Sequence, residues 1–224
     1  MEAISLSISN GFAAGLLGAV SANGVSLVNK ALMYVREQDI DKLDRSKLRI
    51  IVETAGFAIV FAMIEFMVEN PVKAVFIMTI FTVLYGVGVC DSIYKIIPNE
   101  YVIVITLIAA IMLNSGYSSI SAANAIAGGA AGILIFIYPY MKSAAFGGGD
   151  VKLCAAAGLI VGLGGLLAAI VSMGIILIIY TFYMLVKTKN VVLTKMIPIG
   201  PILTVCIFIQ IILLDIMPDY GRFI

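Results

Sequence analysis

Two aspartates carry the clearest chemical signal in this sequence. Asp91 follows an apolar run, in GVGVCDSIYKIIPNE, and Asp150 follows a glycine run, in AAFGGGDVKLCAAAG. Two carboxyl groups brought together from separate helices can share one proton. The ionised group then acts as general base on a water molecule, and the neutral group donates a proton to the carbonyl oxygen or the leaving amine. We therefore treat Asp91 and Asp150 as a candidate catalytic pair for peptide hydrolysis.

Other hydrolytic chemistries lack the residues that they need. The 224 residues include no histidine, which excludes a Ser-His-Asp triad, a Cys-His pair and an HExxH zinc site. Cys90, Cys154 and Cys206 are far apart and form no CxxC, so we expect neither a zinc site nor a disulfide framework. We interpret Cys90, beside Asp91, as a packing residue rather than a nucleophile. We expect no metal and no cofactor at the site.

The residues that flank the two aspartates suit an extended peptide substrate. The glycine run removes side chains just before Asp150, so a substrate backbone can approach closely. A Pro-Asn pair after Asp91 presets a turn at the start of the next helix. A lysine two residues after Asp150 could tune the acid or mark the membrane edge, and both interpretations stay open. The candidate substrate-binding residues are Gly147, Gly148, Gly149, Lys152, Pro98 and Asn99.

The same acids allow other interpretations. A single aspartate at a helix end is more often a cap or an interfacial charge than a catalytic group. A small transporter or channel that binds cations or protons at Asp91, Asp150 and Glu53 is as consistent with these residues as a peptidase. The lack of matching half-sequences disfavours it. We interpret Glu53 and Glu65, inside an apolar run, as mostly structural.

The elements that must position the aspartates are membrane helices. Hydrophobic residues make up 62% of the sequence and charged residues 12%, against about 25% charged residues in a soluble domain. This composition excludes a soluble enzyme and a disordered chain, and the net charge of +1 offers no footprint for nucleic acid. We expect an all-α, polytopic membrane protein in contact with membrane lipid, with a single domain over residues 1–224.

Apolar runs predict eight membrane-spanning helices, because a helix needs about 20 mostly apolar residues to cross a bilayer. The predicted spans are 11–34, 50–68, 73–90, 100–114, 122–141, 151–161, 164–186 and 198–217. Gly162, Gly164 and Gly165 mark a break between the sixth and the seventh, although 151–186 could also be one long bent helix. The N-terminal segment has no basic start, so we do not expect a cleaved signal peptide.

Lysine and arginine set the orientation of such a protein, because they are enriched in cytoplasmic loops. With eight spans, twelve of the fourteen basic residues fall on one side of the membrane, and the other side has Lys73 and Arg222. We therefore predict that both termini lie outside. The same topology places Asp91 and Asp150 together at the cytoplasmic face.

Three motifs, in this order, resemble those of the type IV prepilin peptidases. DSIYKIIPN at 91–99 fits the family's first aspartate site, and GGGDVKL at 147–153 fits its G-x-G-D-x-K-[LM] motif. IPIGP at 197–201 resembles the family's I-P-F-G-P element, which opens the last helix. The resemblance implies a GxGD-type intramembrane aspartic peptidase with Asp91 and Asp150 as the catalytic pair.

The resemblance also implies the substrate and the cell compartment. Family substrates are prepilins and pseudopilins, which carry a short basic leader before a hydrophobic helix and are cleaved after a glycine at the junction. The membrane would be the prokaryotic inner membrane. A non-catalytic partner in pilus assembly would leave both aspartates unexplained. The individual prepilin and the oligomeric state stay open.

The sequence departs from the larger members of this family in its first loop. Those members carry two CxxC pairs there, commonly zinc-binding, and also N-methylate the new amino terminus. Residues 35–49 contain no cysteine, so zinc and methyl transfer are not implied for this chain. The short form resembles the peptidases of Flp-type pilus systems, or the preflagellin peptidases.

Overall fold

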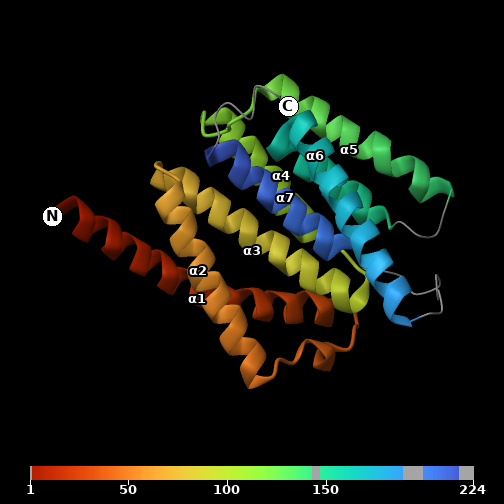
Figure 1. Ribbon diagram of the computed structural model, residues 1–224, viewed down its shortest axis with the longest axis horizontal. Coiled ribbons are helices and arrows are strands. Elements are labelled where there is room, and N and C mark those ends of the chain that lie inside the picture. Colours follow the sequence, from red (N-terminus) through yellow and green to blue (C-terminus); the bar gives the residue numbers. More distant parts are fainter. Residues whose placement is uncertain (1, 143–146, 189–198, 217–224) are drawn as a thin grey trace. The chain divides into compact units, whose positions relative to one another are not determined.

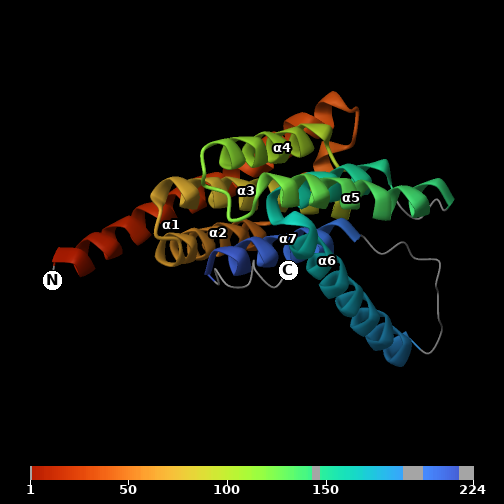
Figure 2. The same ribbon diagram turned by 90° about the horizontal axis from the view of Figure 1, so that it is seen from above.

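The described part of the protein is all-α, as predicted (Figures 1 and 2). The structure is a computed structural model that describes residues 2–142, 147–188 and 199–216. Within these ranges, the regular elements are α-helices and one short 3₁₀ helix, and no strand occurs. They are α1 (Glu2–Val35), η1 (Ile40–Leu43), α2 (Lys47–Met67), α3 (Pro71–Tyr94), α4 (Asn99–Asn114), α5 (Ala122–Lys142), α6 (Gly148–Thr188) and α7 (Ile199–Ile216).

The helices support a polytopic membrane protein, but not the predicted eight spans. Among the described residues, five helices contain segments long and apolar enough to cross a membrane: Asn10–Val35, Lys47–Met67, Pro71–Tyr94, Ala122–Lys142 and Gly148–Met184. The apolar segments of α4 and α7 are shorter. The predicted spans 151–161 and 164–186 both lie in α6, so the count of eight is wrong. The placement of both termini outside requires an even number of crossings, and that prediction therefore loses its basis.

A kink in α6 lies at one of the glycines that the sequence pointed to. Gly162 has φ 73° and ψ −177°, a left-handed conformation that L-residues with a side chain rarely adopt. The amide of Leu163, the next residue, donates a hydrogen bond to Oδ1 of Asn124 at 2.9 Å. Because Asn124 belongs to α5, a neighbouring helix supplies the cap for the second half of α6. The prediction of one long bent helix is thus closer to the structure.

The chain divides into two compact units, Met1–Gly86 and Val87–Ile224, with the boundary inside α3. In the first unit, α1 packs against α2. A Cβ atom added at Gly18 would lie 2.5 Å from the carbonyl oxygen of Phe57, so the two backbones touch there. Phe12 on α1 is 70% exposed, as expected for a side chain that faces lipid. The small residues of α1 thus serve close packing on one face, as helix contacts in membranes require.

In the second unit, α6 packs against α4, α5 and α7 (Figure 1). Glycines on α5 and α6 let these two helices come into backbone contact. A Cβ atom at Gly158 would lie 2.3 Å from the carbonyl oxygen of Gly128, and one at Gly132 would lie 2.5 Å from that of Cys154. Since Cys154 is one turn after Asp150, this close packing fixes the helix that carries the second candidate aspartate.

Replacing Gly158 by alanine is expected to destabilise the protein, because the added methyl group must push two helix backbones apart. We expect a loss of about 1–3 kcal/mol in the free energy of unfolding, measured by denaturant titration in detergent micelles. Gly174→Ala is the matched control in the same helix, because a Cβ atom there meets nothing within 4 Å. Equal stability of the two variants would contradict the close packing of α5 on α6.

Candidate active site

Asp91 lies in the last turn of α3 and is buried, with 8% of its surface exposed. Its Oδ2 accepts a hydrogen bond from the backbone N–H of Gly200 at 3.0 Å. Gly200 is the second residue of α7, where backbone N–H groups have no partner within their own helix. The start of α7 therefore supplies the donor that a buried carboxyl group requires.

Asp150 is the third residue of α6 and is buried to a similar degree, with 9% exposed. Its Oδ2 accepts a hydrogen bond from the N–H of Gly147 at 3.0 Å, and its own N–H donates to the carbonyl oxygen of Gly147 at 3.1 Å. This reciprocal pattern resembles a capping box, in which a side chain in the first turn reaches back to the residue before the helix. An acid in this position is also favoured by the helix dipole. Helix capping thus accounts for the position of Asp150 but for only one of its two oxygens.

The structure brings the segments that carry the two aspartates into contact. Both belong to the second compact unit, and a Cβ atom added at Gly149, next to Asp150, would lie 2.9 Å from Cβ of Ile97 in the loop after Asp91. One comes from the end of α3 and the other from the start of α6. Two neighbouring carboxylates in apolar surroundings repel each other, and one shared proton relieves that repulsion. The arrangement therefore has the elements of an acid–base pair.

The loop after Asp91 contacts the helix that carries Asp150. Lys152 donates a hydrogen bond from Nζ to Oδ1 of Asn99 at 3.1 Å. Pro98, at the N-terminal cap of α4, is buried. The predicted residues Asn99 and Lys152 thus join the two aspartate-bearing segments, and Pro98 lies next to this contact in the sequence.

The three glycines before Asp150 have different surroundings. Gly147 is exposed, and a Cβ atom there would approach Oδ2 of Asp150 at 3.6 Å. At Gly148 an added Cβ atom would lie 3.6 Å from the ring of Tyr140, and at Gly149 it would lie 2.9 Å from Cβ of Ile97. Gly149 therefore allows α6 to pack against the loop after Asp91. The role of the run in substrate binding stays a prediction.

Two residues near the aspartates have contacts that the sequence reasoning did not assign. Gly200 belongs to the IPIGP motif, but nothing in the motif indicates which group its N–H meets. Lys95, at the end of α3, has φ 58°, and its N–H donates to the carbonyl oxygen of Asp91 at 3.0 Å. The left-handed conformation of Lys95 turns the chain sharply after the helix. Such a turn in a non-glycine residue leaves no signal in the sequence.

Comparison with known families identifies the segment that holds both aspartates. Residues 76–184 match the model of the type IV leader peptidase family. This segment belongs to the type IV leader peptidase family. The chain is therefore a peptidase, as the resemblance of its motifs implied. No curated protein and no solved structure matches the chain.

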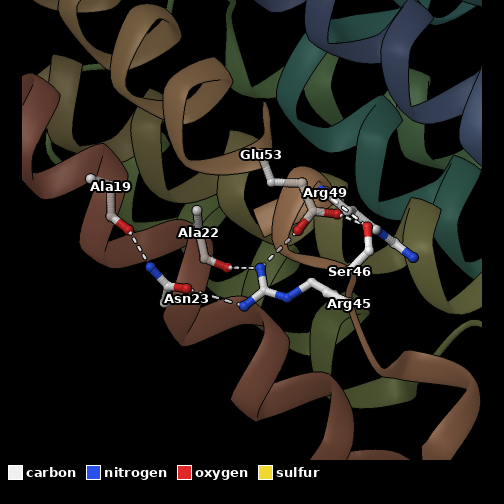
Figure 3. A network of polar contacts seen from close by, with 7 residues as sticks. All are labelled: Ala19, Ala22, Asn23, Arg45, Ser46, Arg49 and Glu53. Carbon is white, nitrogen blue, oxygen red and sulfur yellow. Dashed lines mark hydrogen bonds and ion pairs between the residues drawn. The ribbon is translucent and has the colours of Figure 1, made fainter. Parts of the chain in front are cut away.

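Another acid of the chain, Glu53, is neutralised by two arginines in the first unit (Figure 3). Its Oε2 lies 2.7 Å from Nη1 of Arg45, and its Oε1 lies 2.7 Å from Nε of Arg49. Arg45 also donates to Oδ1 of Asn23 on α1 at 3.1 Å. Because Glu53 belongs to α2, the network joins α1 to α2. These contacts support the structural interpretation of Glu53 and disfavour a cation site there. Among the described residues, no cluster of three His, Cys, Asp or Glu side chains could hold a metal ion.

Glu53→Gln is expected to lower the stability of the protein, because it leaves two partly buried guanidinium groups without their carboxylate. The expected loss is about 1–3 kcal/mol in the free energy of unfolding, measured by thermal and denaturant unfolding in detergent. Glu69→Gln, at an exposed position, is the matched control. If Glu53→Gln were as stable as this control, the network of Figure 3 would not stabilise the fold.

Proposed function

We propose that this leader peptidase is a membrane aspartic endopeptidase that removes the short basic leader of prepilin-like precursors. The substrates would be type IV or Flp-type prepilins or pseudopilins, cleaved after the glycine at which the leader meets the hydrophobic helix. One observation carries the proposal. Two buried aspartates, Asp91 and Asp150, lie on chain segments that contact each other within the stretch that matches a peptidase family.

In the proposed reaction the two aspartates exchange protons with water and with the scissile amide. The ionised carboxylate takes a proton from a water molecule while the oxygen of that water attacks the carbonyl carbon. At the same time the neutral carboxyl group donates its proton to the carbonyl oxygen. The tetrahedral intermediate then collapses. The C–N bond breaks, the leaving nitrogen receives a proton from the acid formed in the first step, and a hydroxyl proton returns to the other carboxylate. The dyad is thereby restored, and a new carboxyl terminus and a new amine are released.

The proposed substrate path runs along the exposed side of the glycine run. Gly147 and Gly148 present no side chain there, so an extended peptide backbone could approach Asp150. Pro98, Asn99 and Lys152 would line the other side of this substrate path, since the Lys152–Asn99 hydrogen bond holds the loop against α6. A substrate helix must open locally before its peptide bond reaches the carboxyl groups, and a glycine at the cleavage site favours opening because glycine has low helix propensity.

We place the proposed site at the cytoplasmic face of a prokaryotic inner membrane. Three lysines lie at the helix ends around the aspartates: Lys95 at the end of α3, Lys142 at the end of α5 and Lys152 at the start of α6. Basic residues that flank spans are enriched on the cytoplasmic side. This local enrichment in lysine is the same whatever the number of crossings. A basic leader attached to a membrane helix would then reach the site from the compartment in which it is made.

Asp91→Asn and Asp150→Asn are each expected to abolish cleavage, because an amide can neither accept nor supply the exchanged proton. Removal of a general acid or base costs on the order of 100- to 10,000-fold in rate. The measurement is co-expression with candidate prepilins, followed by mass determination of the mature amino terminus. Glu65→Gln is the matched control, since it also removes an acid from a membrane helix. Near-normal cleavage by either aspartate variant would refute the dyad, and ion flux into liposomes without any peptide product would support a transporter instead.

Cys90→Ser is expected to keep cleavage of the same order as the unaltered protein. Cys90 is fully buried beside Asp91, in a chain that has no histidine to activate a thiol. The same co-expression assay measures this variant. Loss of cleavage in folded Cys90→Ser, together with formation of an adduct between Cys90 and the substrate, would point to a thiol nucleophile.

A further inference from the structure

From the contact between α7 and Asp91, we infer that Gly200 is a positioning residue of the catalytic pair. The inference rests on the proposed function and gives the IPIGP motif a physical role. The N–H of Gly200 donates to Oδ2 of Asp91 at 3.0 Å, and both residues are buried. The two residues are 109 positions apart in sequence, so this hydrogen bond ties the last helix to the first aspartate.

A glycine is required at this position for a steric reason. A Cβ atom at residue 200 would lie 2.6 Å from Oδ2 of Asp91, 2.7 Å from its Cγ and 2.9 Å from its Cβ. These distances are too short for any carbon atom, so a side chain at 200 would displace the carboxyl group itself. The neighbouring Pro201 supports the same arrangement. Proline is tolerated in the first turn of a helix, where its lack of an N–H costs no intrahelical bond, and it fixes the backbone there.

The hydrogen bond orients the carboxyl group of Asp91. The N–H of Gly200 at the start of α7 holds Oδ2 in place. Because a carboxylate is planar, the direction in which Oδ1 points is then fixed as well. Asp150 has a matching arrangement, since the N–H of Gly147 holds its Oδ2 at 3.0 Å. Among the described residues, each carboxyl group accepts this one hydrogen bond, so the second oxygen of each is available for the shared proton or the attacking water. Gly200 and Gly147 thus act as a pair of backbone donors that fix one oxygen of each acid.

A simple packing role for Gly200 makes a different prediction. Gly88, on α3 in the turn before Asp91, also lies against α7. A Cβ atom at Gly88 would meet Oγ1 of Thr204 at 3.3 Å and Cα of Pro201 at 3.6 Å. None of the three atoms nearest to it belongs to Asp91. Gly88→Ala therefore disturbs the same helix contact without reaching the carboxyl group. It separates loss of packing from loss of orientation.

The test compares kcat and KM for Gly200→Ala and Gly88→Ala in detergent micelles. The substrate is a synthetic peptide with a basic leader that ends in glycine, followed by a hydrophobic segment. We expect Gly200→Ala to lower kcat on the order of 100-fold with little change in KM, because a misplaced catalytic group affects the chemical step. Gly88→Ala should keep both values close to those of the unaltered protein. Equal turnover of the two variants, or a loss confined to KM, would overturn the inference.

A second measurement does not require Gly200→Ala to fold. Hydrogen exchange of glycine amides, followed by NMR of the intact protein labelled with ¹⁵N-glycine, reports the contact directly. In Asp91→Ala the Gly200 amide should exchange about tenfold faster, since it loses a hydrogen bond, whereas the Gly128 amide inside α5 should not change. Unaltered exchange at Gly200 would overturn the inference. If Asp91→Asn stays active while the Gly200 amide responds to Asp91→Ala, the contact is real and the proposed function fails instead.

Discussion

A carboxyl group placed in an apolar helix bundle must receive hydrogen bonds from the protein, because water is scarce there and an unpaired buried charge is costly. Asp91 and Asp150 are both buried, and in both cases the donor is a backbone N–H at the start of a helix. Such N–H groups have no partner within their own helix. The starts of α6 and α7 therefore have to lie where they do, at the two acids.

The choice of a backbone donor matters for chemistry, as Glu53 shows by contrast. Glu53 is held by two arginines, whose positive charges stabilise its ionised form over its protonated form. A backbone N–H orients a carboxylate without a full opposite charge. Under the proposed function, this leaves Asp91 and Asp150 free to exchange protons with each other and with a substrate. The same chain thus contains a neutralised acid that joins helices and two acids suited to acid–base catalysis.

Much of the helix pattern could be predicted from the sequence, since apolar runs of 15–20 residues are strong signals. Residues 100–114 and 122–141 correspond to α4 and α5 within one residue at each end. The kink in α6 could be placed at its glycines, but its form depends on Asn124 of another helix. That tertiary contact has no local signature. The predicted number of spans was wrong because α6 continues through the kink as one helix.

The candidate site could be predicted only as far as side chains define it. The aspartates, Asn99 and Lys152 could be selected from the sequence because each carries a functional group, and Pro98 because proline fixes the backbone. The sequence presents the glycines as one run that admits a substrate backbone, whereas Gly149 packs on Ile97 and Gly148 lies near Tyr140. Their different roles arise from neighbours that are distant in sequence. Gly200 could not be assigned at all, because a backbone donor leaves no trace in the pattern of side chains.

The dependence of Asp91 on Gly200 also bears on where the catalytic unit ends. The segment that matches the family stops at residue 184, before α7 begins. It contains both aspartates, yet within it Asp91 would be a buried carboxyl group without its backbone donor. A buried acid in that condition would have to turn toward water or take up a proton permanently. Either change would separate it from Asp150 as a working partner. If the proposed function holds, α7 is therefore part of the catalytic unit, because it supplies the hydrogen bond to Asp91.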